Sequence, residues 1–173
     1  MSEDRGTYVE HDGRPAVRFR RHLDHPPARV WAAITAPDEL ARWFPSGVTY
    51  EPHAGAAVTF AGDPHLPTTQ GTVLAFDPPH RFAFTWGGDE LHLTVEPGPD
   101  GGAILTLVNV LERRDSAARN ATGWTVCLGV LARELAGERT TGPHGDDVPP
   151  FRPLYEAYVA DGLPSGAPVP GDV

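Results

Sequence analysis

The densest group of possible metal ligands is the run His22-Leu23-Asp24-His25, which holds two imidazoles and one carboxylate. Histidine nitrogens and carboxylate oxygens are common zinc ligands. In a strand, however, residues 22 and 25 point to opposite faces, and no second group of ligands follows at a characteristic spacing. We therefore expect no metal site. The sequence also lacks a glycine-rich phosphate loop and a serine nucleophile motif, so we expect no cofactor.

Few titratable side chains could transfer a proton inside this protein. Glu90 and His92 share the strand face opposite Leu91 and Leu93, so we expect them outside the sheet. Arg21 interrupts an apolar strand face, but a side chain at a strand end can reach solvent, which favours a surface role over contact with a ligand anion. This scarcity favours a binding protein over an enzyme and leaves the question of catalysis open.

Three further residues have functional side chains. Asp63 and His65 lie in the loop from Gly62 to Pro67 and are candidates for the mouth of a cavity. Cys127 is the only cysteine, so an intramolecular disulfide is excluded. Its place on an apolar helix stripe favours a buried thiol over a nucleophile.

Length and composition indicate an ordinary globular protein. The 173 residues and 40% hydrophobic content suit one domain. The net charge of -9 disfavours nucleic acid and anionic membranes as partners, because both attract basic surfaces. No run approaches the roughly 18 apolar residues that span a bilayer, and Met1 to Arg5 do not resemble a secretory signal. We therefore expect a cytoplasmic protein.

One long helix is predicted between Ser116 and Gly137. Ser116 is a plausible N-cap, and Gly137 falls where a left-handed residue commonly ends a helix. The apolar stripe has the spacing of a 3.6-residue repeat and consists of Trp124, Cys127, Leu128, Leu131 and Leu135. This stripe should face a sheet.

Strands dominate the rest of the chain. A strand is expected at 16–24, followed by two short helices at 28–34 and 37–43. Short runs separated by turn residues then predict an antiparallel meander with strands at 48–51, 57–61, 69–77, 81–87, 90–97 and 103–112. Alternation predicts an apolar inner face on the last three strands. It consists of Phe82, Phe84 and Trp86 on 81–87, of Leu91, Leu93 and Val95 on 90–97, and of Ile104, Thr106, Val108 and Val110 on 103–112. Asn109 is out of register with this face.

Several motifs occur in order along the chain: the strand at 16–24 with Pro27-Ala28-Arg29-Val30-Trp31, the pair Trp43-Phe44, the run Phe76-Asp77-Pro78-Pro79-His80-Arg81-Phe82 leading to Trp86, and Gly123-Trp124 in the final long helix. Together they resemble the activator of heat-shock protein 90 ATPase homologue-like family of the START-like (SRPBCC) superfamily, over residues 16 to 137. The resemblance implies an α+β helix-grip fold of the START/Bet v 1 type, in which a curved antiparallel sheet wraps around a long C-terminal helix and leaves a hydrophobic pocket.

The expected organisation is an N-terminal segment at 1–14, a START-like domain at 15–140, and a region at 141–173 with a linker, a short amphipathic helix and a disordered tail. The amphipathic helix has apolar residues at Phe151, Leu154, Tyr155, Tyr158 and Val159. It could fold back on the long helix or dock on a neighbouring subunit, which would make a homodimer.

The resemblance implies a protein that binds a small apolar molecule. The expected pocket residues are Trp43, Phe60, Phe76, Phe84, Trp86, Trp124 and Leu128. Two alternatives stay open: a polyketide cyclase-like enzyme using the same pocket, and a stress-related protein-interaction module. Unfilled space inside the grip would favour ligand binding, a buried carboxylate or histidine with a shifted pKa would favour the enzyme, and a solid core would favour the interaction module.

Overall fold

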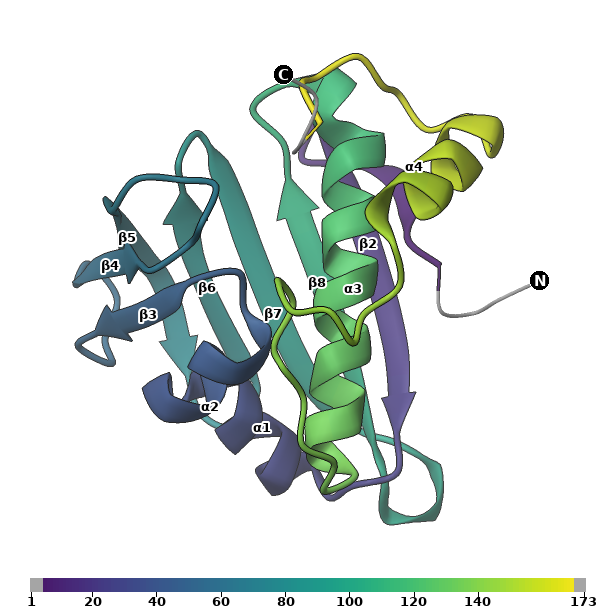
Figure 1. Cartoon of the computed structure of the whole chain (residues 1–173). Coiled ribbons are helices and arrows are strands. Elements are labelled where there is room, and N and C mark those ends of the chain that lie inside the picture. Colours follow the sequence, from purple (N-terminus) through teal and green to yellow (C-terminus); the bar gives the residue numbers. More distant parts are fainter. Residues whose placement is uncertain (1–4, 170–173) are drawn as a thin grey trace.

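The computed structural model describes residues 5–169, and its main feature is an antiparallel sheet that curves around one long helix (Figure 1). The sheet has eight strands in the order β1-β2-β8-β7-β6-β5-β4-β3. The helix-grip fold expected from the sequence is confirmed. No helix among the described residues has the length and apolarity needed to cross a membrane.

The strands are β1 (Thr7–His11), β2 (Arg14–Leu23), β3 (Gly47–Tyr50), β4 (Ala57–Ala61), β5 (Thr69–Asp77), β6 (Arg81–Trp86), β7 (Asp89–Pro97) and β8 (Ala103–Val110). The helices are α1 (Pro27–Thr35), α2 (Pro37–Trp43), α3 (Ala117–Leu135) and α4 (Phe151–Ala160), with short 3-10 turns at Pro99–Gly101 and Arg114–Ser116. The strands and helices predicted between residues 16 and 137 therefore exist, with ends that differ by at most two residues.

The long helix α3 lies across the concave face of the sheet (Figure 1). Its apolar stripe is buried as predicted. Gly137 has a φ of 86° and follows the last turn, which ends with a bond from the Glu138 amide to the Arg133 carbonyl. Ser116 precedes the helix, but its hydroxyl donates to the Arg113 carbonyl and does not cap α3. The predicted position of the N-cap is thus correct, and its predicted hydrogen bond is wrong.

The segment 1–14 contains a strand that the sequence analysis did not assign. β1 pairs with β2 through a turn in which Asp12 has a φ of 50° and Gly13 a φ of 78°. An Asp-Gly pair with two positive φ angles is the strongest short hairpin signal in a sequence, because its twist matches that of the flanking strands. The sheet therefore begins before residue 15.

The predicted inner face of β8 is wrong by one residue. Leu107 is buried, and Asn109, also buried, pairs with Leu91 of β7. Paired residues of neighbouring strands point to the same side of a sheet, so Asn109 faces α3, and Val108 faces outward. Periodicity could not reveal this, because β8 carries apolar side chains on both faces.

The C-terminal region folds back on the same chain. α4 packs against α3 (Figure 1). The Tyr158 hydroxyl lies 2.6 Å from the Thr125 hydroxyl oxygen. The following residues are also fixed: the Ala118 amide donates to the Pro164 carbonyl, and Ala167 is buried. Residues 164–169 were expected in a disordered tail, but they are ordered and held against the start of α3. Residues 170–173 lie outside the described range.

Candidate functional site

An aromatic cluster lies between α3 and the half of the sheet formed by β3 to β6, and we call it the Phe44 cluster. Phe44 follows α2 and is 1% exposed. Its ring centroid lies 6.2 Å from Phe60, 6.0 Å from Phe84, 5.8 Å from Trp86 and 5.6 Å from Trp124. One ring thus joins β4, β6 and α3. Phe44 was not among the expected pocket residues, although the pair Trp43-Phe44 is one of the motifs of the resemblance.

Four of the predicted pocket residues, Phe60, Phe84, Trp86 and Trp124, belong to the Phe44 cluster. Trp43 is buried beside it, and its indole N–H donates to the Ala33 carbonyl at 2.9 Å, which ties α2 to α1. Leu128 is buried one turn after Trp124. Contact of any of these side chains with a ligand stays a prediction.

Phe76 lies in a second aromatic group with Trp31, Tyr50 and Phe82. Phe82 connects this group to the Phe44 cluster, because its ring centroid is 5.0 Å from that of Phe84. Among all these rings, four are only half-buried: Trp31, Tyr50, Phe76 and Trp86. They therefore mark the places where the aromatic interior approaches solvent.

The rings fill the interior of the grip. Ring separations near 6 Å are those of aromatic pairs in contact. Two open spaces in the described structure lie elsewhere: a shallow groove over β6 and β7 near His80 and Glu96, and a space of about 10 Å³ among α1, α2 and α3 beside Leu131. A ligand beneath α3 would therefore have to displace side chains.

Asp63 and His65 lie together at one edge of the aromatic interior, and their place at a cavity mouth stays a prediction. The Asp63 side chain is 9% exposed and accepts a hydrogen bond from the His65 amide at 2.7 Å. His144 covers this edge: its Nε2 donates to the Pro45 carbonyl at 2.7 Å and lies 3.9 Å from Asp63 Oδ1. Burial, and then the charge of Asp63, raise the pKa of the Cys127 thiol, so this cysteine is an inert core residue as expected.

Residues 138–150, which we call the strap, connect α3 to α4 and hold His144 in this position. Arg133 in the last turns of α3 binds the Asp147 side chain at 3.2 Å, and the Thr141 hydroxyl donates to the same carboxylate at 2.5 Å. Val148 packs against the core. The strap thus lies over this edge and is held there by polar contacts that are mostly exposed.

Three polar residues meet at the other end of the interior, beside Trp124, and we call them the polar end. The Asn109 carbonyl oxygen accepts hydrogen bonds from Trp124 Nε1 at 3.0 Å and from Asn120 Nδ2 at 2.9 Å. The Asp89 carboxylate accepts from Asn109 Nδ2 at 3.0 Å, from Asn120 Nδ2 at 3.1 Å and from the Glu112 amide at 2.9 Å. β7, β8 and α3 each supply one member.

Burial raises the pKa of Asp89, outweighing its hydrogen bonds with the Glu112 amide and Asn109 and the charge of Arg119, which lower it. The folded protein then binds this proton more tightly than the unfolded chain, so the carboxyl's contribution to the free energy of unfolding falls as pH rises from the unfolded pKa through the folded one. We expect Asp89→Asn to remove this pH-dependent contribution to the free energy of unfolding, because an amide does not titrate. Urea unfolding of both proteins at several pH values should show wild-type stability, relative to the variant, decreasing across that window; a constant or increasing difference would contradict it.

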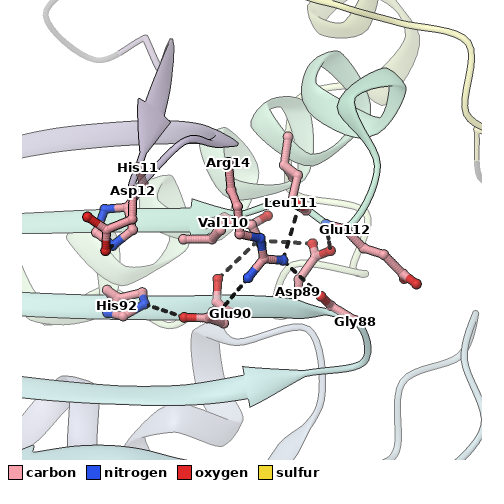
Figure 2. A network of polar contacts seen from close by, with 11 residues as sticks. His11, Asp12, Arg14, Gly88, Asp89, Glu90, His92, Val110, Leu111 and Glu112 are labelled. Carbon is pink, nitrogen blue, oxygen red and sulfur yellow. Dashed lines mark hydrogen bonds and ion pairs between the residues drawn. The ribbon is translucent and has the colours of Figure 1, made fainter.

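Glu90 and His92 lie on the outer face of the sheet, as predicted, but a network of polar contacts partly covers them (Figure 2). His92 Nε2 is 3.0 Å from Glu90 Oε1, and Arg14 Nη1 donates to Glu90 Oε2 at 2.6 Å. The His11 ring lies 5.0 Å from the His92 ring, because the hairpin of β1 and β2 turns over this face. The hydrogen bond from His92 lowers the pKa of Glu90. These residues fasten the hairpin and do not face the aromatic interior.

Two other predicted positions lie away from the site. Arg21 is half-buried on β2, and its guanidinium carbon lies 5.6 Å from the centroid of the Phe19 ring. Within residues 5–169, no group of three or more His, Cys, Asp or Glu side chains is arranged to hold a metal ion, and this includes His22 and His25.

Sequence reasoning missed the polar end, although one signal was present. Asp89 alternates with Leu91, Leu93 and Val95, so the period of two already placed it on the inner face of its strand. No comparable signal exists for Asn120, because half-buried helix positions carry polar residues routinely.

Comparison with known proteins supports this architecture. A family model described as "Activator of Hsp90 ATPase homolog 1-like protein" matches residues 24–136. CalU16 from Micromonospora echinospora is similar in structure, with 21% identity, 90% of this chain and 94% of that chain covered, and a TM-score of 0.67. The protein of gene BPP1335 from Bordetella parapertussis is 26% identical, with 90% of this chain and 88% of that chain covered and a TM-score of 0.63. DynU16, described as a putative protein in the dynemicin biosynthetic locus, is 25% identical, with 73% of this chain and 50% of that chain covered and a TM-score of 0.63. No curated protein matches significantly.

Proposed function

The chain belongs to the activator of Hsp90 ATPase homolog 1-like family, and from this premise we propose that it binds a small, mainly apolar molecule between α3 and the sheet. The family and its START-like structural neighbours support a ligand-binding protein. The Phe44 cluster carries the proposal, because it gathers five aromatic side chains on the concave face of the grip. Aromatic surfaces of this kind hold apolar ligands mainly by burying their area.

Binding in this site requires the interior to open. Trp86 is half-buried at the rim, and the strap rests over the opposite edge through exposed contacts such as Arg133 with Asp147. Exposed ion pairs contribute roughly 0–1 kcal/mol each, so the strap can be displaced at small cost. Entry beneath the strap and rotation of rings at Phe44 would then create the pocket.

The proposal is tested by an NMR titration with naphthalene that follows the indole N–H signals of the four tryptophans. We expect the signals of Trp86 and Trp124 to shift. Trp86→Ala should weaken binding about tenfold, because it removes an aromatic wall worth about 1–2 kcal/mol. The control Leu74→Ala removes an exposed side chain from β5 and should leave the affinity unchanged. Absence of any shift at Trp86 and Trp124 would refute the proposal.

Two observations favour other functions in the same fold. The filled interior is what an interaction module without ligand would show, and it predicts that naphthalene fails to bind. The half-buried Asp89, with its raised pKa and its place beside Trp86, is the feature expected of a cyclase-like enzyme that transfers a proton. Asp89 would then be its acid or base, and Asp89→Asn would abolish turnover while leaving naphthalene binding intact.

A further inference from the structure

We propose that the bound molecule carries a hydrogen-bond donor, a hydroxyl or a protonated amine, at the end that lies beside Trp86, and that the Asp89 carboxylate accepts this donor. The inference rests on the proposed function and specifies its ligand class. The ligand is an aromatic or alicyclic alcohol or amine, as opposed to a fatty acid or another anion.

The position of Asp89 follows from the hairpin between β6 and β7. Trp86 and Asp89 are direct cross-strand partners on either side of the two-residue turn Gly87-Gly88. Cross-strand partners project to the same face, with Cβ atoms about 4.5–5.5 Å apart. An apolar ring that stacks on Trp86 therefore places a substituent at its edge within reach of the carboxylate. Both residues are half-buried, so the carboxylate is shielded but still reachable.

The hydrogen-bonding capacity of Asp89 is incompletely used. An ionised carboxylate offers about four lone-pair sites. Asp89 Oδ2 accepts hydrogen bonds from Asn109 and Asn120, while Oδ1 accepts one hydrogen bond, from the Glu112 amide. Oδ1 can therefore accept one more hydrogen bond. The three hydrogen bonds that the carboxylate already accepts hold it in a fixed orientation.

The charges at the polar end select against anions. The two amide side chains that contact Asp89 are neutral, and the Arg119 guanidinium donates to Asn120 Oδ1 at 3.0 Å and to the Pro168 carbonyl at 3.3 Å. Arg119 thus acts on Asp89 only through its charge. A ligand carboxylate would meet the Asp89 carboxylate directly, whereas a donor would meet an oriented acceptor.

The test compares related probes on the wild-type protein at neutral pH, with dissociation constants measured from the indole N–H signals. We expect 2-naphthol to bind about tenfold more tightly than naphthalene, because hydrogen bonds to charged groups are the stronger class. The methyl ether 2-methoxynaphthalene has no donor and should bind like naphthalene. The anion 2-naphthoate should bind more weakly than naphthalene.

A pair of variants ties the preference to one residue. Asp89→Asn removes the charge with little change of shape and should remove the advantage of 2-naphthol without changing the affinity for naphthalene. Glu96→Gln is the matched control, because it removes one carboxylate from the exposed face of the same strand, β7. The control should behave as wild type. If Asp89→Asn does not fold, the wild-type comparison of 2-naphthol with its methyl ether still decides the matter.

Failure of this inference is distinguishable from failure of the proposed function. If naphthalene binds at Trp86 and Trp124 but 2-naphthol binds no more tightly than its methyl ether, the donor-accepting role of Asp89 is refuted and the apolar site stands. If no probe binds, both are refuted.

Discussion

Replacing Phe44 with alanine is expected to lower the free energy of unfolding by about 3–5 kcal/mol, measured by urea denaturation. The ring is 1% exposed and contacts rings from β4, β6 and α3, so its removal leaves a cavity at the centre of the grip. The loss combines the transfer of the ring out of water with the residual cavity, since rigid rings such as Phe60 and Phe84 can close it only in part.

The same variant tests whether this space can hold a ligand. An engineered apolar cavity stays dry and can bind a small aromatic molecule. We expect Phe44→Ala to bind naphthalene more tightly than wild type, because the wild-type protein must first move the Phe44 ring. Phe44→Leu fills more of the space and should show a smaller effect on both stability and affinity. A loss of stability below about 1 kcal/mol would show that Phe44 does not hold the interior together.

Replacing Asn109 with alanine is expected to cost about 2–4 kcal/mol of unfolding free energy. Asn109 is fully buried, and it is the acceptor for the indole N–H of Trp124. Its removal leaves that N–H without its hydrogen-bond partner, and it also takes one donor from Asp89. An unsatisfied buried polar group costs more than the net value of the bond that satisfied it.

A double-mutant cycle separates this hydrogen bond from packing. Trp124→Phe removes the N–H, so Asn109→Ala should cost about 1–2 kcal/mol less in that background than in wild type. Val108→Ala is the control: the residue precedes Asn109 on β8 but faces outward, and its replacement should cost little. Additive losses in the cycle would mean that the bond between Asn109 and Trp124 contributes nothing to stability.

Helix and strand assignments succeeded where a residue pattern had one interpretation. The stripe from Trp124 to Leu135 has a period of 3.6, and Leu91, Leu93 and Val95 have a period of two, so each face followed from local geometry. Failures occurred where local geometry was ambiguous or ignored. β8 is apolar on both faces, so its residue pattern did not reveal that Asn109 points inward. The Asp12-Gly13 pair predicts a hairpin turn, but no strand was assigned before it.

The aromatic composition of the site was predictable, but its arrangement was not. Phe60, Phe84, Trp86 and Trp124 were all among the expected pocket residues. That Phe44 sits among them depends on how α2 is placed against the sheet. The strap could not be anticipated either, since His144 reaches Asp63 only because α4 folds back on α3.

The sequence alone determined which side of most elements is apolar and that an antiparallel sheet packs against a long helix, because backbone periodicity fixes side-chain direction within an element. Only the tertiary structure decided what stands at the two ends of the interior. Asp89, Asn109 and Asn120 lie on three elements, and packing brings them within hydrogen-bond distance. Their meeting depends on the register of β7 against β8 and on the position of α3 along the sheet, and these are set by the fit of many side chains at once.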